Sequence, residues 1–105
     1  MSDPDDETLT CGHICLSPEA RTLIAAGRHH HMTPKECQLL EILLRHEGQV
    51  LTRQFLMKRV WQTDFIADTR TLEVHIHWLR EKIEMGGQPR LIFTVRSVGY
   101  VLRAA

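Results

Sequence analysis

The feature that most constrains this chain is an amphipathic helical pattern over residues 68–84, followed at once by a β-like segment. Four apolar residues recur at steps of four, three and four, namely Leu72, Ile76, Leu79 and Ile83. This spacing places them on one face of an α-helix. The other side of the helix carries Arg70, Glu73, His77, Trp78, Arg80 and Glu81. Such a helix is expected to bury its apolar stripe and to present its polar side to a partner.

The segment after this helix has the pattern of two short strands joined by a turn. It covers residues 91–102, with Gly99 near the bend. Asp68 or Thr69 is the expected helix cap, and Gly86 and Gly87 stop the helix. We therefore expect the hairpin to lie beside the helix.

Two earlier helices are predicted from their capping residues. Thr33 can cap a helix, Pro34 suits its first position, and Glu36 completes a capping box. The apolar stripe that follows predicts a helix through about residue 45, ended near Gly48. Thr52 is the expected cap of a shorter helix over residues 53–61, and residues 62–67 form a loop.

The region from Thr8 to His31 predicts short strands. One alternates from Leu9 to Cys15, a turn follows at residues 16–18, and further strands cover residues 21–25 and 28–31. The order is thus sheet, helix, helix, loop, helix and hairpin. It predicts an α+β fold, a winged helix-turn-helix with a small N-terminal antiparallel sheet, three helices and a C-terminal β-hairpin wing.

The charges divide the chain unevenly. Residues 1–7 hold four acids and no base and are interpreted as a flexible acidic tail or the remnant of a linker. Residues 8–105 form the domain, with 13 bases against nine acids, and the basic excess lies beyond Gly48. This basic excess suits a phosphate-bearing partner. The alternative is that the uneven charge distribution arose by chance on a solvated surface.

The N-terminus does not resemble a secretory signal. No apolar run approaches the roughly 20 residues of a membrane span. A single small domain of 105 residues, cytoplasmic and without a membrane partner, is therefore expected.

The cysteines raise a metal site as a competing interpretation. An odd number of them, without a signal peptide, argues against a disulfide framework. Cys11, His13 and Cys15 would share one face of a single strand, with residues 29–31 as a source of a fourth ligand. This spacing matches no closed zinc motif, so we expect neither a metal nor a cofactor. No nucleophile or phosphate-loop motif occurs, so we expect no enzyme.

Four motifs carry a resemblance to a known family. They are Met32–Glu36 with Leu39 and Leu40, Thr52–Trp61, Thr69–Ile76 with Leu79–Ile83, and Thr94–Tyr100. In this order and at this spacing they make the region from Leu9 to Leu102 resemble the DNA-binding effector domain of OmpR/PhoB-type response regulators.

The resemblance implies a function in transcription regulation. The domain would bind double-stranded DNA sequence-specifically as the effector of a two-component system, with the third helix (about residues 69–84) in the major groove and the wing (about 91–102) at the minor groove. It also implies two protomers on direct-repeat half-sites and a receiver domain in a longer protein. A loop is implied to face RNA polymerase, here Gln62, Thr63, Asp64, Phe65, Ile66 and Ala67.

Several residues match family positions that contact the DNA backbone, namely Arg53, Trp61, Arg70, His75 and Arg80. Their N–H groups can donate to phosphate oxygens, as can the hydroxyl of Thr94. Two alternatives stand beside this interpretation. Trp61 can be a core anchor, and Arg70 can pair with Asp68 or Glu73 on the helix surface.

His77 and Trp78 depart from the family pattern, which commonly has polar or basic residues there. We hypothesise that Trp78 meets thymine methyl groups and that His77 donates to a phosphate or a purine. The alternative is that Trp78 packs against the wing. Arg96 matches the wing arginine that enters the minor groove, where a narrow groove concentrates negative potential. Ser97 stands where the family usually has glycine.

The alternative function is a winged helix used only for protein–protein contacts. It predicts an apolar exposed face on the third helix, and the arginines and histidine there argue against it. Binding that weakens as salt is raised would favour DNA.

Overall fold

The N-terminal part of the chain forms a four-stranded antiparallel sheet. The computed structural model describes residues 7–63 and 70–104. The strands are β1 (Leu9–Cys11), β2 (Ile14–Ser17), β3 (Thr22–Ala25) and β4 (Arg28–His31), and they follow one another in the order β1-β2-β3-β4. The predicted small antiparallel sheet is confirmed.

The prediction of one strand from Leu9 to Cys15 is wrong. The chain turns after Cys11, where Gly12 has a φ of 56°, and Cys11 pairs back onto Ile14. A left-handed φ is easily adopted by glycine, which has no Cβ. Because of this turn, Ile14 is buried like Cys11, whereas Cys15 is only partly buried.

Three helices follow, and their positions agree closely with the prediction. They are α1 (Pro34–Arg45), α2 (Arg53–Trp61) and α3 (Arg70–Ile83). The capping box of α1 is confirmed, and the Thr52 hydroxyl accepts the expected bond from the amide of Phe55 at 3.0 Å. The predicted cap of α3 lies outside the described residues. A short 3₁₀ turn (Met85–Gly87) follows α3.

The C-terminal hairpin belongs to a three-stranded sheet, of which the sequence predicted two strands. β6 (Ile92–Val95) and β7 (Gly99–Leu102) form the hairpin, and β5 (Leu51–Thr52) pairs with β7, giving the order β5-β7-β6. Gly99 lies at the start of β7, opposite Thr52. A Cβ at Gly99 would lie 1.9 Å from the carbonyl oxygen of Leu51, so only glycine permits this approach.

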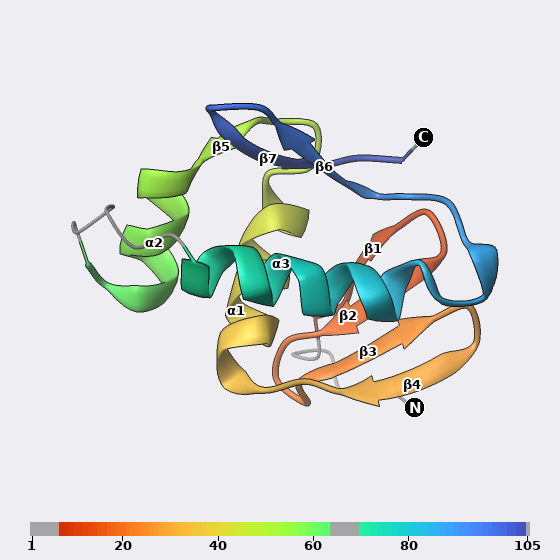
Figure 1. Ribbon diagram of the computed structural model, residues 1–105. Coiled ribbons are helices and arrows are strands. Elements are labelled where there is room, and N and C mark those ends of the chain that lie inside the picture. The colour runs from red at the N-terminus through yellow and green to blue at the C-terminus, as the bar shows by residue number, and fades with distance from the viewer. Residues whose placement is uncertain (1–6, 64–69, 105) are drawn as a thin grey trace.

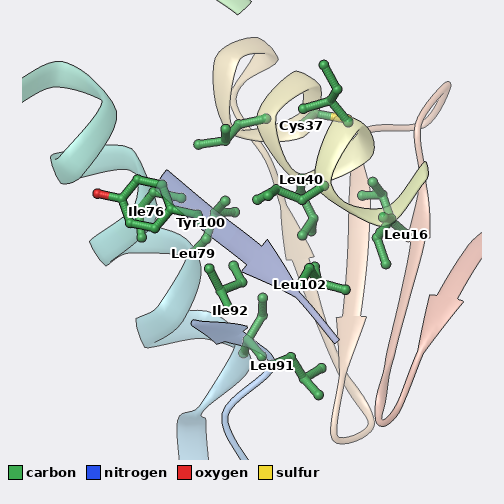
Figure 2. Close-up of a cluster of buried hydrophobic side chains, with 14 of the residues drawn as sticks. Leu16, Cys37, Leu40, Ile76, Leu79, Leu91, Ile92, Tyr100 and Leu102 are labelled. Atoms are coloured by element: carbon green, nitrogen blue, oxygen red, sulfur yellow. The ribbon is translucent and has the colours of Figure 1, made fainter. Parts of the chain in front are cut away.

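Helix α3 lies between the two sheets. In Figure 1, α3 crosses the middle of the molecule, with β3 and β4 below it and the β5-β7-β6 sheet above. Figure 2 shows side chains from α1, α3, β2 and the hairpin meeting in one hydrophobic cluster. The predicted stripe of α3 is confirmed, because Leu72, Ile76, Leu79 and Ile83 are all at most 1% exposed.

An ion pair fastens the end of α3 to the start of α1. Lys82 Nζ donates to Glu36 Oε2 at 2.6 Å, and the side chain of Glu36 is only 4% exposed. The same carboxylate accepts the capping bond from the amide of Thr33. Burial of the α3 stripe and this pair together fix which face of α3 points outward.

None of the helices in the described part of the chain combines the length and the apolar character that crossing a bilayer requires.

Candidate nucleic-acid interface

The face of α3 that points away from the core carries the side chains expected to contact a partner. Arg70, His77 and Trp78 are exposed there, and Trp78 keeps 43% of its surface accessible. His77 Nε2 lies 2.8 Å from Glu81 Oε1, one helical turn further on. A contact between His77 and DNA therefore competes with this surface pair.

Three aromatic rings line up where α2 meets α3. The ring centroid of His75 lies 5.0 Å from that of Trp61 and 5.0 Å from that of Trp78. His75 Nδ1 lies 2.7 Å from the carbonyl oxygen of Thr71, and because a carbonyl only accepts, Nδ1 carries the proton. We call Trp61, His75 and Trp78 the aromatic ladder.

The structure bears on the alternatives for the two tryptophans. Trp61 is partly buried and packs against the hydrophobic core, so a packing role holds at least in part, and its indole N–H remains a candidate phosphate donor. The Trp78 ring contacts His75 of its own helix in a tilted arrangement.

Arg80 joins α3 to the hairpin. Its Nε donates to the carbonyl oxygen of Ile92 at 3.1 Å, and its Nη2 donates to Thr94 Oγ1 at 2.7 Å. Burial lowers the pKa of Arg80, as does the nearby positive charge of Arg90. Two predicted contact residues, Arg80 and Thr94, are thus brought into direct contact with each other.

Tyr100 lies beside two of the predicted phosphate-contacting arginines. The guanidinium carbon of Arg53 is 5.5 Å from the ring centroid, and that of Arg80 is 5.9 Å away. Tyr100 is only 3% exposed, so its ring is mainly a packing element. No local sequence pattern links these three residues, because they come from α2, α3 and β7.

The wing tip is formed by residues 96–98, all of them exposed. The amide of Val98 donates to the carbonyl oxygen of Val95 at 2.9 Å, which closes the turn and holds Arg96 at its outer side. Ser97 has a φ of 64°, the left-handed conformation for which glycine is the usual choice. The carbonyl oxygen of Val98 also accepts from the amide of Arg53, so the tip is tied to the start of α2.

The expected polymerase-facing loop is described only at its beginning. Gln62 is exposed and ends α2 in the left-handed conformation, with a φ of 57°. Thr63 is half-buried. Asp64, Phe65, Ile66 and Ala67 lie outside the described residues.

The geometry does not support the competing metal interpretation. Because β1 ends before Gly12, Cys11 and Cys15 lie on different strands, and His13 donates through Nε2 to the carbonyl oxygen of Ile83 at 2.7 Å. Burial, followed by the charge of Glu47, raises the pKa of the Cys11 thiol to about 11. Across residues 7–63 and 70–104, no three His, Cys, Asp or Glu side chains are placed to hold a metal ion.

The sequence is similar to transcriptional regulators. Residues 27–102 match the family described as "Transcriptional regulatory protein, C terminal". The chain is 44% identical over 100 residues to the response regulator MprA of Mycobacterium sp. (strain KMS), covering 95% of this chain and 44% of that protein. The chain thus spans less than half the length of this relative.

Two solved DNA-binding domains match this chain along almost their whole length. The DNA-binding domain of CpxR from E. coli has a TM-score of 0.80 at 29% identity, covering 94% of this chain and 98% of that one. The DNA-binding domain of Klebsiella pneumoniae RstA, solved in complex with the RstA box, has a TM-score of 0.79 at 26% identity, covering 92% and 97%. With the matched region spanning all three helices and the hairpin, the chain belongs to the family of C-terminal domains of transcriptional regulatory proteins, in the OmpR/PhoB-type winged-helix form.

Proposed function

We propose that this domain binds double-stranded DNA sequence-specifically and regulates transcription as the effector domain of a two-component response regulator. The observation that carries the proposal is the exposed face of α3, whose neighbour is the hairpin that holds Arg96 at its tip. The Arg80–Thr94 bond joins these two elements. A helix and a wing held together in this way suit the major groove and the adjacent minor groove.

The proposed contacts divide into positioning contacts and base contacts. Phosphate contacts come from Arg53, Trp61, Arg70, Arg80 and Thr94. His75 joins them through Nε2 when both ring nitrogens carry a proton, because its Nδ1–H is already donated to Thr71. Arg80 uses Nε and Nη2 inside the protein, yet a guanidinium has five N–H donors, so others remain for a phosphate. Arg96 contacts the minor groove. His77 contacts DNA after its pair with Glu81 breaks.

The remaining partners are proposed by analogy with the family. Two protomers bind adjacent direct-repeat half-sites, since one small module buries only about 600–1,000 Å² on DNA. Residues 62–67 face RNA polymerase, and a receiver domain belongs to the full protein. The lengths support the last point, because this chain covers 44% of the response regulator MprA.

The deciding experiment is a DNA-binding titration at several salt concentrations, followed by selection of the bound sequences from a random duplex pool. We expect an enriched direct repeat and an affinity that falls steeply with salt. Each phosphate contact contributes about 0.9 to the slope of log affinity against log salt concentration.

Arg96→Ala should weaken binding to the enriched site and reduce the salt slope by roughly one. Arg45→Ala is the matched control, because Arg45 lies on α1 and pairs with Glu7 and Glu41. If no sequence is enriched and salt has no effect, the proposal fails, and a winged helix used for protein–protein contacts takes its place.

A further inference from the structure

The aromatic ladder places an indole ring on the outer face of α3 and supports it from behind. Trp61, at the inner end, is packed against the core, whereas Trp78, at the outer end, is 43% exposed. His75 lies between them, with both ring centroids at 5.0 Å. The outermost ring is therefore supported through the middle ring by a side chain anchored in the protein.

The middle ring is itself held in place. Its Nδ1–H donates to the carbonyl oxygen of Thr71 at 2.7 Å, which ties the imidazole to the preceding turn of α3. The ring plane of His75 makes an angle of 78° with that of Trp61 and 54° with that of Trp78. The edge-to-face arrangement of His75 and Trp61 is one of the favoured geometries for aromatic pairs. Trp78 thus rests against a ring that is itself hydrogen-bonded to the helix.

The chemistry at this outer position is apolar. An indole has one N–H donor and no acceptor, so it cannot form the paired hydrogen bonds by which arginine recognises guanine. The neighbouring His77 pairs with Glu81 at 2.8 Å, and beside it the exposed indole of Trp78 offers an apolar face. In the major groove the apolar group that such a face can cover is the C5-methyl group of thymine.

We propose that Trp78 is a specificity-determining residue that selects thymine methyl groups in the major groove, and that Trp61 and His75 are positioning residues which hold its ring in place. This inference rests on the proposed function. It gives His75 a second role beside any phosphate contact, since its ring orients Trp78.

The test removes the methyl group and nothing else. In the DNA site found by selection, each thymine is replaced in turn by deoxyuridine, and the affinity of the purified domain is measured for each probe. At one or more positions the wild type should bind the deoxyuridine probe about fourfold more weakly, the value expected for one buried methyl group. Trp78→Ala should bind both probes equally.

Two variants of His75 separate positioning from phosphate contact. His75→Ala removes the ring, whereas His75→Phe keeps a ring between the two tryptophans but has no N–H to donate. Both lose any phosphate contact, so both should bind more weakly overall. Only His75→Phe should keep the thymine preference. Near-ultraviolet circular dichroism, dominated by the two tryptophans of the chain, checks that each variant is folded.

The outcomes separate the two claims. If the wild type binds a selected site but does not distinguish thymine from deoxyuridine, this inference is wrong and the proposed function stands. The inference is also wrong, with the proposed function unaffected, if Trp78→Ala still binds thymine more tightly than deoxyuridine. If His75→Ala and His75→Phe both keep the preference for thymine over deoxyuridine, the positioning role of His75 is wrong. If no site is selected at all, the proposed function itself fails.

Discussion

The ion pair between Lys82 and Glu36 offers the sharpest test of how α3 is held in place. Glu36→Gln keeps the shape of the side chain and an oxygen that can accept the capping bond from the amide of Thr33. It removes the negative charge that Lys82 contacts at 2.6 Å. The substitution therefore isolates the link between α1 and α3.

The expected loss follows from the burial of the pair. Hydrogen bonds to charged groups contribute about 1.5–3 kcal/mol, and breaking a fully buried ion pair costs about 3–5 kcal/mol. The side chain of Glu36 is 4% exposed but that of Lys82 is 26% exposed, so water partly compensates the ammonium. We expect the free energy of unfolding to fall by about 2 kcal/mol, which lowers the Tm of a domain of this size by about 8–16 °C.

The matched control is Glu41→Gln in the same helix. Glu41 pairs with Arg45 on the surface, with side chains 31% and 41% exposed, and such pairs contribute only about 0.2–1 kcal/mol. Urea unfolding followed by circular dichroism at pH 7 compares the two variants. If they lose the same free energy, the reasoning that burial makes the Lys82–Glu36 pair important is refuted.

The pH dependence of the same pair provides a second check. Burial raises the pKa of Glu36, but the bonds from Lys82 and Thr33 together outweigh burial and bring it below its ordinary value of 4.5. Stabilisation by the carboxylate is thus present above about pH 4.5 and is lost as the pH falls through the lowered pKa. The difference in stability between wild type and Glu36→Gln should shrink in acid.

Three further predictions concern the hairpin and the N-terminal sheet. Gly99→Ala places a Cβ 1.9 Å from the carbonyl oxygen of Leu51, so it should separate β5 from β7 and lower the free energy of urea unfolding by about 2–4 kcal/mol; an unchanged value would contradict the approach seen here. In the same assay, Ser97→Gly should leave the free energy of unfolding nearly unchanged. Ser97→Val should lower it by about 1–2 kcal/mol, because a β-branched residue tolerates a φ of 64° poorly. Equal stabilities of the two variants would contradict a left-handed conformation at the wing tip. Burial, with the charge of Lys82 next in effect, lowers the pKa of His30, so the stability of the wild type should fall as the pH drops below 6.5 towards that lowered value. His30→Leu should flatten this pH dependence of stability. An unchanged dependence would contradict the role given to the lowered pKa of His30.

Features that depend on neighbouring residues could be predicted from the sequence. The capping box of Thr33 and Glu36 sets the start of α1, and Thr52 sets that of α2. The steps of four, three and four define the buried face of α3. Caps and periodicity act within one or two helical turns, so the sequence carries their information directly.

Features that depend on distant segments could not be predicted. β5 has only two residues and exists because residues 51 and 52 meet β7. Lys82 reaches Glu36 across 46 positions, and Arg80 reaches Thr94 across the turn between α3 and the hairpin. Hydrogen bonds of this kind depend on how packing brings the backbone segments together.

The candidate interface shows the same division. The sequence by itself determined which residue types stand on the outer face of α3 and at the wing tip, because the buried stripe leaves the other positions exposed. Only the tertiary structure decided that Trp61 from α2 supports His75 and Trp78, and that Arg53 and Arg80 lie beside one buried tyrosine. The physical reason is that side-chain period is a local property of a helix, whereas contact between helices depends on the packing of the whole core.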